Sequence, residues 1–170
     1  MIRVCFHGAE STGKSVLARK LAAEWECPLV PEYGRAYAEN VSTDFTPDDL
    51  LAIGREQNRL MQVACADRPP LALLDTDPLM TAAWSDMLFG DVPSALLAYD
   101  KAELYLLFTP DVPWVADGTR LFGTHELRGQ FAATARTMLE RSGVPFETIT
   151  GGWAAREAQV RAVIARAQTI

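Results

Sequence analysis

Eight consecutive residues near the start of the chain have the types and spacing of a phosphate-binding loop. They match the pattern G-x-x-x-x-G-K-S/T at every fixed position and are Gly8, Ala9, Glu10, Ser11, Thr12, Gly13, Lys14 and Ser15. The glycines allow backbone N–H groups to turn inward around a phosphate, and the helix that follows presents its positive end to the anion. We expect Lys14 to reach the β- and γ-phosphates of ATP, the Ser15 hydroxyl to bind Mg²⁺, and Val16 to complete the nucleotide site.

Acidic side chains follow the second and third apolar runs of the chain, where strands of a sheet would end. Ligands of an open parallel sheet lie outside the carboxyl ends of its strands, so these acids are candidate site residues. Glu32 is placed to accept the proton of an attacking hydroxyl and Arg35 to bind a phosphate or carboxylate, with an exposed ion pair as the alternative. Asp75 is a candidate Mg²⁺ ligand. Asp77 precedes a proline, so it is either a site residue or only the N-cap of a helix.

The segment 109–123 is rich in proline, glycine and aspartate, and it leads into a helix that carries several arginines. Phosphoryl transfer requires that water be kept away from the γ-phosphate, and a closing segment with arginine meets this need. We therefore expect a lid at about 111–130, in which Arg120 and Arg128 reach phosphate. Aromatic residues that could stack on a ligand ring, or equally belong to the core or its rim, are Tyr33, Trp84 and Trp114.

The elements that position these residues alternate between short apolar runs and helical patterns. Buried strands separated by helices indicate a parallel sheet covered on both faces, which is a three-layer α/β domain. We expect strands at 3–7, 29–33, 71–74, 104–108 and 146–150. We expect helices from about 14 to 26, and at 47–66, 78–89, 126–141 and 154–167. The whole chain, 1–170, then forms one domain.

Composition and charge limit the compartment and the partners. The chain has 170 residues, 49% of them hydrophobic, and a net charge of −6, which gives no electrostatic reason to bind nucleic acid. It has no apolar run long enough to span a membrane and no room for a signal peptide ahead of the loop, so we expect a cytoplasmic protein. The cysteines Cys5, Cys27 and Cys65 form no metal or redox pattern and are expected as free thiols. Whether the protein is a monomer or a homo-oligomer stays open.

The rest of the sequence narrows the class of nucleotide-binding protein. A guanine-specific switch would carry N/T-K-x-D and D-x-x-G segments, and an ABC-type ATPase would carry an LSGGQ-like signature; none of them occurs in the chain. A kinase of a small molecule remains. The alternative is a regulatory module that binds ATP, or hydrolyses it slowly, without a phosphoryl acceptor.

Four segments together resemble the ribosylnicotinamide kinase domain of NadR-type proteins, a P-loop kinase related to AAA_28-like ATPases. They are GAESTGKS at 8–15, PEYGR at 31–35, DTD at 75–77 and PDVPWVADGTR at 110–120. The resemblance implies a sheet of strand order 2-3-1-4-5 and transfer of the γ-phosphate of ATP to the 5′-hydroxyl of nicotinamide riboside. It also implies that substrate and metal are faced by Glu32, Tyr33, Arg35, Asp75, Asp77 and Trp114, and that the lid contains Asp117 and Arg120.

The chain departs from this family at two positions. Pro31 stands where members that act on nicotinamide riboside carry an aromatic residue, and Asp117 stands alone where they carry two aspartates. The nucleotide site of the adenylyltransferase domain that often precedes such kinases has no counterpart, so we expect a stand-alone kinase. Another nucleoside or a small polyol remains the alternative acceptor.

Overall fold

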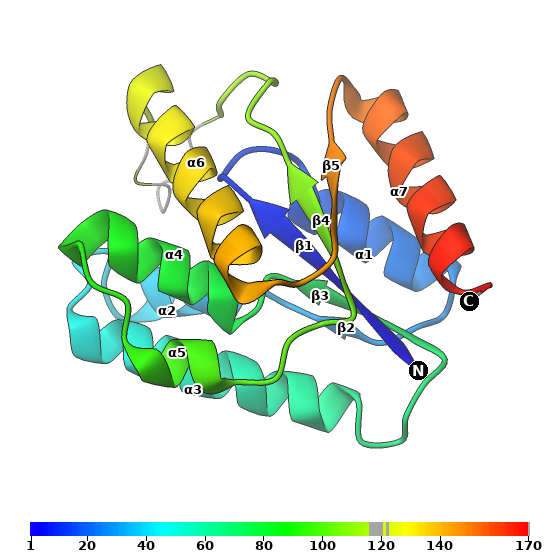
Figure 1. Cartoon of the computed structure of the whole chain (residues 1–170), viewed down its shortest axis with the longest axis horizontal. Coiled ribbons are helices and arrows are strands. Elements are labelled where there is room, and N and C mark those ends of the chain that lie inside the picture. The colour runs from blue at the N-terminus through cyan, green and yellow to red at the C-terminus, as the bar shows by residue number, and fades with distance from the viewer. Residues whose placement is uncertain (116–120, 122, 170) are drawn as a thin grey trace.

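A parallel sheet of five strands runs through the middle of the molecule (Figure 1). The computed structural model describes residues 1–115, 121 and 123–169. The strands lie in the order β2-β3-β1-β4-β5, and every neighbouring pair is parallel. They are β1 (Ile2–Gly8), β2 (Leu29–Val30), β3 (Leu71–Asp75), β4 (Leu104–Phe108) and β5 (Phe146–Ile149). The predicted fold class and strand order are both confirmed.

Helices cover both faces of the sheet and complete the three layers. On one face lie α1 (Lys14–Glu24) and α7 (Trp153–Ala167), and the other helices gather on the opposite face (Figure 1). These are α2 (Tyr33–Asn40), α3 (Pro47–Ala64), α4 (Pro78–Phe89), α5 (Ser94–Ala98) and α6 (His125–Ser142). Each crossover between parallel strands needs a connection of this kind, which is why strands and helices alternate along the chain.

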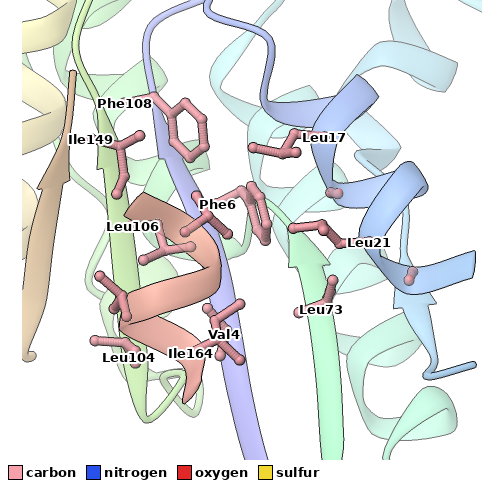
Figure 2. Packing of buried hydrophobic residues seen from close by; sticks show 14 of the residues in the cluster. Val4, Phe6, Leu17, Leu21, Leu73, Leu104, Leu106, Phe108, Ile149 and Ile164 are labelled. Atoms are coloured by element: carbon pink, nitrogen blue, oxygen red, sulfur yellow. The ribbon is translucent and has the colours of Figure 1, made fainter. Parts of the chain in front are cut away.

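The core beneath α1 and α7 is built from alternate side chains of the strands. Phe6 and Phe108 stack with their ring centroids 5.6 Å apart, and helix residues such as Leu17, Leu21 and Ile164 close over them (Figure 2). The intervening strand residues point to the opposite face and pack under α3, α4 and α6. The strands are therefore apolar on both sides, as a sheet between two helical layers requires.

The second strand is shorter than predicted, and two helices were missed. The prediction of a strand over 29–33 was wrong beyond Val30: Pro31 has no N–H to continue the ladder, and Tyr33 already begins α2. The missed helix α2 is only eight residues long, and none of its residues, all of which are described, is buried. The other missed helix, α5, is only five residues long.

The carboxyl ends of the central strands meet at one edge of the sheet. Phe6 on β1 pairs with Asp75 on β3, which places the end of β3 beside the phosphate loop. The loop leaves β1 at Gly8, whose φ is +121° and whose missing Cβ would lie 2.4 Å from the Phe108 carbonyl oxygen. Only glycine fits so close to the neighbouring backbone. The phosphate loop and the end of β3 therefore lie side by side at this edge.

Cys5, Cys27 and Cys65 are all free. Within the described residues, none of the helices is both long and apolar enough to cross a bilayer.

Leu106 in β4 provides a test of the core. Its side chain is fully buried between the sheet and the α1 and α7 layer, so we expect Leu106→Ala to lower the free energy of unfolding by about 2–5 kcal/mol. Urea denaturation measures this loss. The control is Val63→Ala on α3, where the side chain is 62% exposed and the change should stay within about 0.5 kcal/mol. Equal losses in the two variants would contradict the packing described.

Candidate active site

The phosphate loop of residues 8–15 forms the floor of a cavity between β1 and α1. Gly13, at φ +86°, precedes the first turn of α1, and the loop is braced by the Thr12 hydroxyl, which donates to the Ala9 carbonyl at 2.9 Å. The free N–H groups of a helix start attract anions. The cavity is lined by Gly8, Glu10, Ser11, Thr12, Gly13, Lys14, Ser15, Val16, Arg19, Glu32, Arg35, Thr76, Met80, Trp84 and Phe131. Of the predicted loop residues, all but Ala9 line it.

Lys14 lies inside the phosphate loop, where we expect it to bind the phosphates of ATP. Its side chain is only 8% exposed, and its ammonium donates to the carbonyls of Gly8 at 2.8 Å and Ala9 at 2.6 Å. Burial lowers the pKa of Lys14, while the charges of Glu32 and Asp75 act in the opposite direction. The ammonium is thus held at the loop, where a bound phosphate would compete with the two carbonyl oxygens for its hydrogen bonds.

Glu32 lies between β2 and α2, with its carboxylate close to two opposite charges. A carboxylate oxygen lies 3.8 Å from Nε of Arg35, so the ion pair considered from the sequence forms at the cavity wall. Burial, and then repulsion from Asp75, raise the pKa of Glu32 to about 7, although Lys14 and Arg35 pull it down. A carboxylate with a pKa near neutrality is suited to accept a proton from a substrate hydroxyl.

Asp75 is the last residue of β3 and is buried beside the cavity. Asp75 is 4% exposed. Its carboxylate oxygen Oδ1 has no hydrogen-bond partner among the residues that the structure describes. Buried carboxylate oxygens are normally satisfied, so an orphaned one close to Glu32 fits a site for a cation. Ser15 lines the phosphate cavity, whereas Asp75 is not among the described residues that line either site cavity. This donor set of hard oxygens is the kind that Mg²⁺ prefers.

Asp77 takes the capping role considered from the sequence. One of its carboxylate oxygens accepts from the backbone N–H of Leu79 at 3.0 Å at the start of α4, and the other accepts from the Tyr105 hydroxyl. Burial raises the pKa of Asp77 to about 6. In the described part of the chain, Asp77 is absent from the lining of both site cavities, so its expected contact with substrate remains a prediction.

Thr76 lies between Asp75 and Asp77 and forms a strained turn. Its φ is +73°, a left-handed conformation that costs a β-branched residue on the order of 1–3 kcal/mol. The Thr76 N–H donates to the Phe6 carbonyl at 3.2 Å, which ties the turn to β1. The turn leaves Asp75 near the phosphate loop and Asp77 at the start of α4. Nothing in the local sequence indicated this conformation.

A second cavity adjoins the first and is more apolar. Rings from distant segments line it, with Phe45 edge-on to Trp84 at 6.5 Å between centroids. Its own lining residues are Gly34, Ala38, Phe45, Leu50, Ile53, Gln57 and Thr81. Both cavities share Glu10, Glu32, Arg35, Thr76, Met80 and Trp84. Glu32 therefore lies where a phosphate group and an apolar, ring-bearing molecule would meet.

Two of the expected aromatic residues lie elsewhere. Tyr33 packs edge-on against Tyr37, 6.3 Å between centroids, and is not among the described residues that line either cavity. The ring of Trp114 lies against Gly123 at the base of the expected lid. Of the three aromatic candidates, Trp84 is the one that the fold brings to the site.

The described part of the expected lid is bonded to the phosphate loop. The backbone N–H of Val115 donates to the Ser11 hydroxyl at 2.8 Å, and that of Leu121 donates to the Glu10 carboxylate at 3.2 Å. Arg128, buried in α6, donates to the carbonyls of Val112 at 2.6 Å and Ser11 at 3.1 Å. Its guanidinium thus braces the backbone of both segments, and the expected contact with phosphate stays a prediction.

Two expected lid residues, Asp117 and Arg120, lie outside the described residues.

Arg156 of α7 supports the loop from behind and was missed in the sequence. The guanidinium is 1% exposed and donates to the carbonyls of Thr12 at 3.2 Å, Gly151 at 2.6 Å and Thr109 at 2.9 Å, and it pairs with Asp111. Three loops that are far apart in the chain are joined in this way. Arg156 stands four residues before Val160 and seven before Val163, on the buried face of α7. This helical spacing is the sequence signal that could have found it.

A phosphate loop between a strand and a helix, at the carboxyl edge of a parallel sheet of this order, defines a P-loop nucleotide-binding domain. Residues 3–156 match the AAA_28 family, described as an AAA domain, and the chain belongs to this family.

Curated relatives include the trifunctional NAD biosynthesis/regulator protein NadR of Escherichia coli (strain K12). It is 31% identical over 152 residues, which are 84% of this chain and 37% of the relative. NadR of Salmonella typhimurium (strain LT2) is 30% identical over the same shares. The chain thus spans little more than a third of the length of these relatives.

Solved structures share the fold. A NadR protein in complex with NR superposes with a TM-score of 0.77 and 23% identity, over 95% of this chain and 50% of that one. A thymidylate kinase from Ehrlichia chaffeensis superposes with a TM-score of 0.70 and 13% identity, over 96% of this chain and 98% of that one.

The electrostatics of Glu32 can be tested without any substrate. We expect its carboxyl to titrate at about pH 7 in the nucleotide-free protein, as followed by ¹³C NMR of the side-chain carboxyl. Asp75→Asn removes a negative neighbour and should lower this pKa, whereas Lys14→Met removes a positive one and should raise it. Asp67→Asn, an exposed acid at the opposite end of β3, is the control and should leave it unchanged. Titration of Glu32 at the pH of an ordinary exposed glutamate would contradict this account.

Proposed function

We propose that the chain is a kinase that transfers the γ-phosphate of ATP to the 5′-hydroxyl of nicotinamide riboside, giving nicotinamide mononucleotide. The observation that carries the proposal is the position of Glu32 at the junction of the phosphate cavity and the apolar cavity. Relatives support the choice of substrate: they are NAD biosynthesis proteins, and solved NadR structures hold NR, or NAD and AMP-PNP.

The chemistry proposed for the site follows from the charges around Glu32. The acceptor hydroxyl loses its proton to the Glu32 carboxylate while its oxygen forms a bond to the γ-phosphorus. The bond between that phosphorus and the oxygen of the β-phosphate breaks, and ADP leaves with the electron pair. Lys14 balances the charge of the transferred group, and the lid, in which we place Asp117 and Arg120, excludes water.

Mg²⁺ would be held by the Ser15 hydroxyl and the Asp75 carboxylate. The orphaned Oδ1 of Asp75 fits such a ligand, and when bound the ion neutralises charge on the phosphates. The protein itself supplies the oxygens and keeps them at the carboxyl edge of the sheet.

The apolar cavity provides the surface for the base of the acceptor. Because Pro31 replaces the aromatic residue expected from the family, the rings of Phe45 and Trp84 are the surfaces on which a planar ring can pack. Arg35 at the cavity wall is placed to bind polar groups of the ribose.

A second candidate function is an ATPase module without an acceptor, which the match to an AAA domain favours. The two are separated by ATP turnover with Mg²⁺ against a panel of nucleosides that includes nicotinamide riboside, following ADP and phosphorylated product together. The kinase predicts acceptor-dependent ADP formation with an equal amount of nicotinamide mononucleotide. ADP formation that is indifferent to every acceptor would favour the ATPase.

Lys14→Ala should lower turnover by at least about 10²-fold, the scale of one lost charge-stabilising donor. The matched control is Lys20→Ala on the same helix, whose exposed side chain pairs only with a surface acid, Glu157, in the described residues. Steady-state ADP release compares the two variants. Near-normal activity of Lys14→Ala would overturn the nucleotide site.

Glu32→Gln should lower phosphoryl transfer by about 10²-fold or more while leaving ATP affinity nearly unchanged, because the amide cannot accept the proton. Calorimetric titration of ATP and single-turnover transfer separate these two effects. Glu39→Gln, an exposed residue of α2, serves as the control. Weaker ATP binding with unaffected transfer would contradict the assignment of Glu32 as the base.

A further inference from the structure

Gln57 is a polar side chain buried in the middle of α3, only 2% exposed, at the wall of the apolar cavity. Its amide binds the backbone of two separate turns. Oε1 accepts from the N–H of Tyr33 at 2.8 Å, and Nε2 donates to the carbonyl of Pro31 at 3.2 Å and to that of Thr76 at 3.5 Å. The partners in the first turn are the two residues that flank Glu32, and Thr76 directly follows Asp75.

The contact with Tyr33 fixes the backbone directly after Glu32. Glu32 is the N-cap residue of α2, a position whose side chain normally accepts from the first N–H groups of the helix. In the described chain, the Glu32 side chain makes no such bond, and Gln57 instead satisfies the first N–H of the helix. The acid in the capping position therefore does not cap the helix, and Gln57 holds the backbone N–H next to it.

The contact with Thr76 acts on the second carboxylate. Thr76 is buried in a left-handed conformation, which a threonine keeps only where its surroundings hold it. Its N–H is held by β1, at the Phe6 carbonyl, and its carbonyl by Gln57. One side chain of α3 thus joins the turn that carries Glu32 to the turn that carries Asp75.

We propose that Gln57 is a positioning residue, which sets the separation between the Glu32 and Asp75 carboxylates by clamping the backbone on both sides of the cavity. This role rests on the proposed function in so far as Glu32 is the base. A polar group that merely satisfies the core would not need to bind next to both acids.

The first test is a double-mutant cycle in the full chain. Gln57→Met keeps the volume of the side chain and removes all three hydrogen bonds, and the exposed Gln62→Met on the same helix is its control. We expect Gln57→Met to lower kcat by up to about 10²-fold, the scale of a small misplacement, with little change in the KM for ATP. In the Glu32→Gln background the same change should have a clearly smaller effect, because only the action of Gln57 on the turn that carries Asp75 remains. Equal losses in both backgrounds would overturn the proposal.

The second test needs no turnover. The charged groups that act on Glu32 are Asp75, Lys14, Arg35 and Glu10. We expect Gln57→Met to lower the midpoint of the Glu32 titration, followed by ¹³C NMR, because a looser turn admits water and relaxes the approach of Asp75. An unchanged midpoint in a folded variant would overturn the positioning role.

The two tests distinguish a failure of the proposed kinase function from a failure of the positioning role of Gln57. If no acceptor is phosphorylated, the proposed function fails while the NMR titration still decides the role of Gln57. If Gln57→Met does not fold by circular dichroism, Gln57→Asn replaces it: it keeps the amide but is one methylene too short to reach both turns, so the same shift is expected, and its absence is again decisive.

Discussion

The site depends on one electrostatic balance at the edge of the sheet. Lys14 is buried with its ammonium on the carbonyls of the phosphate loop, and the two carboxylates of Glu32 and Asp75 lie within its field. An isolated charge would be costly to bury, and the attraction between Lys14 and the two carboxylates lowers this cost, whereas the two carboxylates repel each other. The balance also leaves Glu32 with a pKa near neutrality, because burial and Asp75 raise it more than Lys14 lowers it.

Buried polar side chains around these three charged groups hold the backbone in place. Arg128 and Arg156 are both buried, and both direct their guanidinium groups to carbonyls of the phosphate loop and of the segments beside it. Asp77 caps α4, and Gln57 binds the turns next to the acids. Loops at the end of a sheet carry many unpaired backbone groups, so buried polar side chains are needed there to satisfy them. Rigid turns then keep the reactive groups in position.

The proposal of a kinase function rests on two adjoining cavities that share Glu32. A phosphate loop by itself is compatible with an ATPase as well as with a kinase. The adjoining apolar cavity, with Glu32 at the junction, provides a place for an acceptor to meet the γ-phosphate. The fold is shared with a NadR protein and with a thymidylate kinase, and a shared fold by itself does not determine function.

The strand order was predicted from the family resemblance, which extends over nearly the whole chain. Local patterns in the sequence determined the phosphate loop and the helix starts at Thr46 and Asp77, where capping side chains precede a proline. These features depend on residues that are neighbours in the chain. Tertiary structure decided the rest: Phe45 reaches the cavity from a loop, Gln57 reaches both turns from α3, and Arg156 reaches the phosphate loop from the last helix. Such contacts join residues that are far apart in sequence. Helical periodicity places Gln57 and Arg156 on the buried faces of their helices, but it does not determine which backbone groups they bind. Their polar atoms become costly only once folding removes water from them, so their roles appear only in the packed structure.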